Sequence, residues 1–192
     1  MSLLKWNLAL NKNSQDISKV HTIVFDFDGV FTDNHVYVDS NGNELVKCSR
    51  ADSYGLDLLR KSAAKKVIDF FVLTTESNSV VLKRCQKMGI NCIDSQSNKQ
   101  SFLEGWLKKN RGDFEDPLPG VAYFGNDLND LEVMSRVGIS IAPADAHPSI
   151  KKIATFVLNS TGGSGFVREG IELLLGIQKM SVEEVRDFIS NS

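Results

Sequence analysis

Two carboxylates, Asp26 and Asp28, directly follow a short apolar run near the start of the chain. Carboxylates this close repel each other unless a cation or a proton lies between them. Magnesium, an oxygen-seeking ion, meets that need and also binds phosphate oxygens. One carboxylate can then attack phosphorus and form an aspartyl phosphate, while the other protonates the leaving alkoxide and later activates water. On its own, Asp-x-Asp-Gly fits an ordinary turn equally well.

Further polar groups follow apolar runs or open a helical pattern. They are Thr74, Lys99 and the segment 125–130, which contains Asn126, Asp127 and Asp130. Ligands of open α/β sheets bind outside the carboxyl ends of the strands, so these groups are expected to converge with the first two carboxylates. Lys99 would then offset charge on the phosphoryl oxygens and Thr74 would donate a hydrogen bond to one of them. Asn126, Asp127 and Asp130 are the expected further metal ligands.

The elements that would position these groups alternate along the chain. Apolar runs without polar alternation predict strands buried on both faces, as in a parallel sheet; they are 22–25, 70–73, 121–124, 139–142 and 155–158. Asp52 is predicted to cap the first helix, and Ser77 to cap a second over 78–88 that stops at Gly89. Further helical patterns cover 100–109, 128–136 and 165–176. A capping box of Ser181 and Glu184 is predicted to begin the last helix. The alternation predicts a doubly wound α/β domain.

One segment departs from this alternation. Residues 35–39 and 44–48 read as the two strands of a β-hairpin, because Asn41-Gly42 between them is a strong hairpin-turn signal. The hairpin would leave directly after the first strand and project from the carboxyl edge of the sheet. The remaining spacers, from Asp33 to Thr74 and from Lys99 to Asn126, are too short to hold a separate cap domain.

The order of these motifs resembles the haloacid dehalogenase superfamily of phosphatases. Residues 26–33 look like its first motif, Thr74 its second, Lys99 its third and residues 125–130 its acidic fourth, over about residues 21–175. The resemblance implies a Rossmann-like sheet and Mg²⁺ as cofactor. It also implies that Asp26 is the nucleophile, Asp28 the acid and base, and Thr74 and Lys99 the residues that hold phosphate.

The chain is more similar still to the small, capless branch of that superfamily. This branch contains 3-deoxy-manno-octulosonate 8-phosphate phosphatases, nonulosonate (sialic acid, KDN) 9-phosphate phosphatases and the C-terminal domain of some acylneuraminate cytidylyltransferases. The resemblance implies a hairpin flap, no cap domain, and a homotetramer in which a neighbouring subunit completes the site. Residues 1–20 would be an N-terminal extension and 21–192 the phosphatase domain.

The substrate side departs from the octulosonate enzymes, which resemble this chain except that they carry arginines at Ala51, Asp57, Glu76 and Ser164. Glu76 would instead suit an amine, an ammonium group or a hydroxyl. The nine-carbon branch resembles this chain better, since it can carry glutamate there, and this resemblance implies a nonulosonate 9-phosphate as substrate. Asn126 also stands where the family has an aspartate, so metal binding is expected to survive but weaken. The expected substrate-binding residues are Asp33, Arg50, Asp52, Ser53, Thr75, Glu76 and Arg84.

The bulk properties limit the remaining alternatives. A net charge of −2 in 192 residues offers no basic field for nucleic acid, and no apolar run approaches the length of a membrane span. The three cysteines form no CxxC pair, which suits a reducing cytoplasm. The rival to a phosphatase is a non-catalytic oligomerisation module like the cytidylyltransferase domain. The retention of Asp26, Asp28, Thr74 and Lys99 favours the enzyme, because a scaffold has no need for polar groups that are costly to bury.

Overall fold

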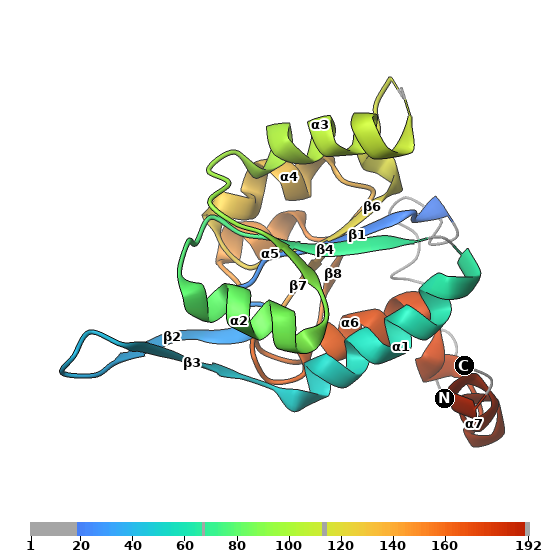
Figure 1. Ribbon diagram of the computed structural model, residues 1–192. Helices are drawn as coiled ribbons and strands as arrows, with labels where there is room; N and C mark the ends of the chain where they lie inside the picture. The colour runs from blue at the N-terminus through green and yellow to red at the C-terminus, as the bar shows by residue number, and fades with distance from the viewer. Residues whose placement is uncertain (1–18, 67, 113–114, 191–192) are drawn as a thin grey trace.

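The computed structural model of the protein describes residues 19–66, 68–112 and 115–190 (Figure 1). The predicted N-terminal extension, residues 1–20, therefore lies outside the described residues except for Lys19 and Val20. None of the helices within the described ranges has the length and apolar character needed to cross a bilayer.

A parallel sheet of six strands forms the centre of the molecule, in the order β5-β4-β1-β6-β7-β8. Its strands in chain order are β1 (Thr22–Phe25), β4 (Asp69–Leu73), β5 (Asn91–Ile93), β6 (Val121–Phe124), β7 (Ile139–Ala142) and β8 (Phe156–Val157). The apolar runs predicted as strands are all present, although β8 is shorter than expected. Strand β1 pairs with β4 and β6, so the carboxylates that follow it lie at the middle of the sheet's carboxyl edge.

Helices cover both faces of the sheet, as the doubly wound prediction requires (Figure 1). They are α1 (Arg50–Lys66), α2 (Ser79–Met88), α3 (Lys99–Arg111), α4 (Leu131–Arg136), α5 (Pro148–Ile153), α6 (Phe166–Leu175) and α7 (Val182–Ser190), with the 3₁₀ turns η2 (Leu118–Gly120), η3 (Leu128–Asp130) and η4 (Ile177–Lys179). Successive residues of β1 point to opposite faces: Ile23 and Phe25 pack with α1, α2 and α6, whereas Val24 packs with α3, α4 and α5. Both faces are therefore apolar, and the polar ends of the strands are left for chemistry.

Two predicted helix caps differ from the structure. Helix α2 begins one residue later than expected, and Asn78 rather than Ser77 is its cap, accepting a hydrogen bond from the Val80 amide at 3.0 Å. Helix α1 begins at Arg50, with the Ser49 hydroxyl accepting from the Ala51 amide at 3.1 Å, so the prediction that Asp52 caps this helix is wrong. The Gly89 stop and the capping box of Ser181 and Glu184 are confirmed.

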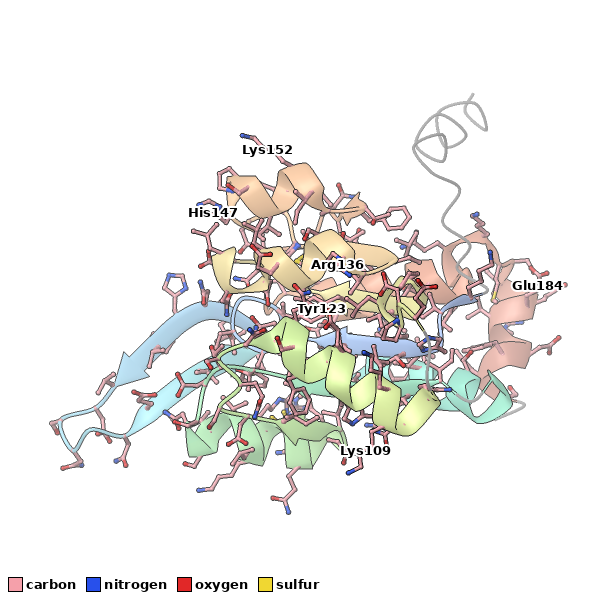
Figure 2. All side chains as sticks on the ribbon, turned by 90° about the horizontal axis from the view of Figure 1, so that it is seen from above. Lys109, Tyr123, Arg136, His147, Lys152 and Glu184 are labelled. Atoms are coloured by element: carbon pink, nitrogen blue, oxygen red, sulfur yellow. The ribbon has the colours of Figure 1, made fainter. Side chains whose placement is uncertain are left out.

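The hairpin consists of β2 (Thr32–Val38) and β3 (Glu44–Cys48), which pair with each other and not with the main sheet. It extends away from the body of the molecule in two perpendicular views (Figures 1 and 2). Its apolar side chains Val36, Tyr37, Val38 and Leu45 are all more than half exposed. Within the described residues there is no cap domain: the chain between β1 and β4 forms this hairpin and α1 alone.

Asp52 joins α1 to α6 instead of capping its own helix. Its carboxylate is buried, and Oδ1 accepts a hydrogen bond from the Arg168 amide at 3.0 Å, at the start of α6. Burial raises the pKa of Asp52 from 3.8 to about 6, more than the nearby backbone amides of Arg168, Gly165 and Val167 lower it. The folded state therefore holds the Asp52 proton more tightly than the unfolded chain does. The stabilisation that this difference provides is complete below about pH 4 and is lost as pH rises through 6.

We therefore expect Asp52→Asn, which keeps an acceptor oxygen but cannot ionise, to gain stability relative to the wild type as pH rises from 4 to 7. The gain should reach roughly 3 kcal/mol, since each pKa unit is worth about 1.4 kcal/mol. Urea unfolding at several pH values measures it. Asp187→Asn, on exposed α7, is the matched control and should follow the wild-type profile. Parallel profiles for Asp52→Asn and the wild type would contradict the assignment.

Candidate active site

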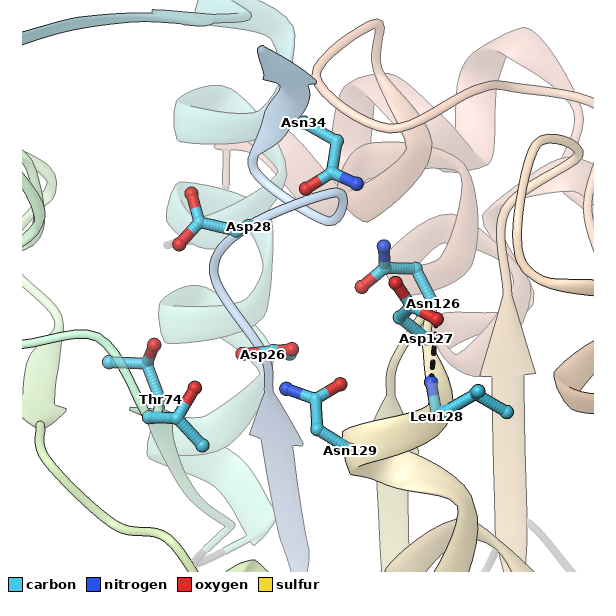
Figure 3. A pocket seen from close by; sticks show the side chains of 9 residues that line it. Asp26, Asp28, Asn34, Thr74, Asn126, Asp127, Leu128 and Asn129 are labelled. Carbon is cyan, nitrogen blue, oxygen red and sulfur yellow. Dashed lines mark hydrogen bonds between the residues drawn. The ribbon is translucent and has the colours of Figure 1, made fainter. Parts of the chain in front are cut away.

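A pocket of about 350 Å³ opens at the carboxyl edge of the sheet. Its lining residues come from the ends of β1, β4 and β6 and from the start of the hairpin: Asp26, Asp28, Asn34, Thr74, Thr75, Asn126, Asp127, Leu128 and Asn129. Figure 3 shows Asp26 at the end of β1, with Thr74 on one side and Asn126, Asp127 and Asn129 on the other. The predicted convergence is thus present for residues that lie far apart in the sequence. No lysine or arginine is among the described residues that line the pocket.

The Asp26 carboxylate forms a buried ion pair with Lys99. Lys99 opens α3 and its Nζ atom lies 2.8 Å from Asp26 Oδ2, while the Phe27 amide donates to Asp26 Oδ1 at 2.8 Å. Burial and the nearby Asp130 charge raise the pKa of Asp26 to about 7 in spite of Lys99. Burial lowers the pKa of Lys99, but the charges of Asp26 and Asp130 outweigh it and the net shift is upward. A further positive charge in the pocket would therefore favour the ionised form of Asp26 at neutral pH.

Asp130 lies beneath the pocket and not in it. Its side chain is completely buried and accepts from Lys99 Nζ at 2.7 Å, from the Tyr123 hydroxyl at 2.9 Å and from the Asn126 amide at 2.9 Å. The Asp127 amide adds a longer contact to the same carboxylate. Asp130 was expected among the metal ligands, but the structure does not bring it to the pocket, because its oxygens are occupied in holding Lys99 and the loop after β6.

Asp28 occupies the outer part of the pocket, above Asp26 (Figure 3). Burial raises the pKa of its carboxyl group; a hydrogen bond from the Thr32 hydroxyl at 3.3 Å opposes this shift, and the charge of Glu76 adds to it. A raised pKa keeps a carboxylic acid protonated at higher pH, which suits a group that must donate a proton to a leaving alkoxide. Thr74, at the end of β4, is buried, and its hydroxyl accepts from the Glu76 amide at 3.1 Å.

Asn126 faces Asp26 and Asp28 from the end of β6 (Figure 3). Its side-chain oxygen is buried and has no hydrogen-bond partner, whereas buried polar atoms in proteins are nearly always paired. Gly29 adopts a left-handed conformation with φ of 71°, and a Cβ atom there would lie 1.9 Å from the Asn126 amide nitrogen. The loop after β1 thus needs glycine at this position to let Asn126 approach the two carboxylates.

The donor set around this point is suited to a hard cation. The Asp26 and Asp28 carboxylates and the unpaired Asn126 oxygen are the kinds of ligand that Mg²⁺ takes. Asp127 also lines the pocket, but it is exposed and its Oδ1 atom accepts from the Leu128 amide at 2.7 Å. No three His, Cys, Asp or Glu side chains in the described ranges form a metal cluster, because the third donor here is an amide.

The residues expected to bind substrate are spread over a wider area. Thr75 lines the main pocket, and Glu76 lines a smaller adjoining one of about 60 Å³ together with Glu44 and Asn78. The remaining placements are as follows: Arg50 is exposed at the start of α1, Asp33 pairs with Lys47 at 3.4 Å, and Arg84 donates to the Ser53 hydroxyl at 2.7 Å. Asp52 was also expected to bind substrate, and the structure does not support this, because it is buried under α6.

Sequence reasoning missed three residues of the site. Asn34 lines both pockets and adopts a left-handed conformation with φ of 62°, a conformation in which asparagine is enriched. Asn129 lines the main pocket from η3. Tyr123 lies inside an apolar strand, and its hydroxyl was the available signal, since a buried tyrosine usually places that group against a polar partner.

The structure thus combines a doubly wound sheet, a buried Lys–Asp pair after the first strand and a second carboxylate two residues on. The model of the haloacid dehalogenase-like hydrolase family matches residues 9–169. The chain belongs to this family.

Individual relatives agree with the family. The chain is 36% identical over 157 residues to the 3-deoxy-D-manno-octulosonate 8-phosphate phosphatase KdsC of Escherichia coli, covering 81% of this chain and 79% of the relative. It is similar to the same phosphatase of Moraxella catarrhalis, solved with magnesium, phosphate and KDO, with a TM-score of 0.75, 29% identity, and coverage of 85% and 90%. A HAD subfamily III A hydrolase structure from Legionella pneumophila gives a TM-score of 0.79, 31% identity, and coverage of 92% and 93%.

Proposed function

We propose that this chain is a Mg²⁺-dependent phosphomonoesterase that forms an aspartyl phosphate on Asp26 and acts on a 2-keto-3-deoxy sugar-acid phosphate. Its family and its relatives make it a phosphatase. The observation that carries the mechanism is the buried ion pair that Lys99 forms with Asp26, a residue that lines the pocket together with Asp28 and Thr74. A buried charged pair is costly unless the site uses it, and such pairs cluster at catalytic centres.

Each residue has a distinct role in the proposed reaction. An Asp26 oxygen attacks phosphorus as the bond from phosphorus to the sugar oxygen breaks, and Asp28 donates its proton to that leaving oxygen. Asp28 then accepts a proton from a water molecule, whose oxygen attacks phosphorus, releases inorganic phosphate and frees Asp26. Lys99 holds Asp26 in place, and Thr74 donates a hydrogen bond to a phosphoryl oxygen.

The Asp26 carboxylate and the Asn126 side-chain oxygen would hold the metal ion, while the Asp28 carboxyl group beside them stays free to carry a proton. The unpaired Asn126 oxygen and the raised pKa of Asp26 support this assignment. Bound there, Mg²⁺ would offset the negative charge of the phosphoryl group, which the pocket lining lacks the cations to do.

Replacing Asn126 by aspartate tests the metal assignment without relying on turnover. We expect Asn126→Asp to bind Mg²⁺ about 10- to 100-fold more tightly, because a carboxylate adds a negative charge to the ligand set. Titration calorimetry with Mg²⁺ measures the change. Asn129→Asp adds the same charge elsewhere on the pocket lining and is the matched control. If both variants bind Mg²⁺ more tightly to the same extent, the added charge acts at a distance and residue 126 is not a metal ligand.

The proposed substrate is a nonulosonate 9-phosphate in preference to an octulosonate 8-phosphate. Glu44 and Glu76 lie beside Asp28, close enough for their charges to raise its pKa. A carboxylate of the substrate would be repelled there, whereas hydroxyl groups could donate to both glutamates. A nine-carbon chain keeps its carboxylate farther from the phosphate than an eight-carbon chain does.

A phosphate-release screen with Mg²⁺ tests both levels of the proposal. It compares octulosonate 8-phosphate, N-acetylneuraminate 9-phosphate and the deaminated nonulosonate 9-phosphate. Higher kcat/KM on a nine-carbon ester is the expected result. A preference for the eight-carbon ester would overturn the reading of Glu76 and leave the phosphatase assignment in place. An absence of turnover on all three would favour the non-catalytic oligomerisation module.

We further propose that the chain forms a homotetramer in which the hairpin of a neighbouring subunit helps to cover the site. The exposed apolar side chains of the hairpin support this, with Val38 and Leu45 each 64% exposed. Apolar side chains that cluster on a projecting hairpin are typical of an interface. Sedimentation equilibrium of the full chain measures the assembly, and a monomer across the micromolar range would contradict it.

A further inference from the structure

The three cysteines of the chain lie close to one another at the same apolar cluster. Cys48 ends β3, Cys85 lies in the second half of α2, and Cys92 is the middle residue of β5. Cys85 is 1% exposed and belongs to the apolar core, and Cys48 and Cys92 are half-buried against that core. All three are free thiols.

Two of these thiols are in direct contact. The side chains of Cys85 and Cys92 lie close enough to change each other's ionisation, and both pack into the same apolar cluster. The contact follows from the tight turn between α2 and β5: Gly89 has φ of 65°, and the Ile90 amide donates to the Cys85 carbonyl at 3.1 Å. This turn reverses the chain so that the end of the helix lies over the strand, and it holds the two sulfur atoms together.

The two thiols are chemically unequal. The interaction between the two side chains raises the pKa of Cys85 and lowers the pKa of Cys92. Burial also disfavours the Cys85 thiolate. Cys92 is the more exposed of the two, and β5 is an edge strand of the sheet with one side unpaired. Since the thiolate is the reactive form, Cys92 is the sulfur that an external reagent meets first.

We propose that Cys85 and Cys92 are a redox-active dithiol that closes to an intramolecular disulfide when a low-molecular-weight disulfide reaches Cys92. The Cys92 thiolate attacks one sulfur of the reagent, forms a mixed disulfide and releases the first thiol. Cys85 then gives up its proton, attacks the Cys92 sulfur and releases the second thiol. The protein loses two hydrogen atoms and the reagent is reduced to two thiols, so that atoms and electrons balance.

Cys48 takes no part in this reaction. Burial raises the pKa of its thiol, and this effect is larger than the opposite effect of the neighbouring Arg84. The chain therefore contains its own matched control cysteine.

The disulfide would form next to a strand residue that is bonded to the pocket. Cys92 directly precedes Ile93, whose carbonyl accepts a hydrogen bond from the Thr74 amide at 3.0 Å. The modified strand is thus bonded directly to the segment that presents Thr74 to the pocket.

The test treats the reduced full chain with oxidised glutathione, unfolds it in the presence of N-ethylmaleimide and measures the intact mass and the peptide map. The wild type should lose two of its three alkylatable thiols, and only Cys48 should carry the maleimide. Cys48→Ser should form the same disulfide. Cys85→Ser should stop at a stable glutathione adduct on Cys92, and Cys92→Ser should keep Cys85 reduced.

Dithiothreitol should restore all three thiols of the wild type. The proposal is overturned if the treated wild type retains three alkylatable thiols, keeps glutathione on Cys92, or pairs Cys48 with either other cysteine. Circular dichroism checks the fold of the serine variants. The wild-type and Cys48→Ser results decide the question even if a serine variant at position 85 or 92 does not fold.

Discussion

Asp26→Asn is expected to abolish phosphate release, with a loss in kcat on the order of 10⁴-fold or more, because an amide is a poor nucleophile toward phosphorus. The variant should still fold. The Phe27 amide donates a hydrogen bond to Asp26 at 2.8 Å, and the side-chain oxygen of asparagine can accept the same bond. Initial rates of phosphate release, measured with the best substrate of the screen, give the loss directly.

The control for this variant is Asp187→Asn, the same chemical change on exposed α7. It should retain wild-type rates. A second readout is independent of turnover: beryllium fluoride, which mimics a phosphoryl group on a carboxylate, should attach to the wild type in the presence of Mg²⁺ and not to Asp26→Asn. Turnover by Asp26→Asn at the wild-type rate would mean that another group attacks phosphorus.

Lys99→Met is expected to lower the free energy of unfolding by about 3–5 kcal/mol, because it leaves buried carboxylates without their cation. Lys99 Nζ lies 2.8 Å from Asp26 and 2.7 Å from Asp130, and both side chains are almost completely buried. The loss should shrink as pH falls, since Asp26 without Lys99 takes up a proton more readily. Urea unfolding at two pH values measures both effects.

A double variant separates the ion pair from the packing of the lysine stem. Asp26→Asn combined with Lys99→Met should lose less stability than Lys99→Met alone, because one unpaired buried charge has gone. Lys108→Met, on the exposed part of α3, is the matched control and should change stability little. A Lys99→Met variant as stable as the wild type would show that the buried pair contributes nothing to the fold.

Much of the fold was predictable because its signals are local. The apolar runs that became β1, β4, β6 and β7 are nearly continuous in hydrophobic residues, as expected of strands with helices on both faces. The Asn-Gly turn marked the hairpin in the same way. The convergence of Asp26, Thr74 and Asn126 followed from the parallel sheet alone, since the ends of its strands meet at one edge.

The errors arose where a side chain bonds to a distant element. Asp52 has the composition of a helix cap, and no local pattern reveals that its partners are the amides at the start of α6. Asp130 has the spacing of a metal ligand, and only the folded structure shows Lys99 and Tyr123 occupying its oxygens. Long-range partners of this kind depend on packing, which hydrophobic periodicity does not encode.

The central position of β1 has a consequence for how the enzyme is made. Thr22 pairs with Asp69 on one side and with Val121 on the other, so the strand that leads to Asp26 is completed only by segments synthesised long after it. Pairings between residues so distant along the chain carry a large loop-closure cost and form slowly. A ribosome must therefore translate beyond β6 before the nascent polypeptide can acquire any hydrolytic competence.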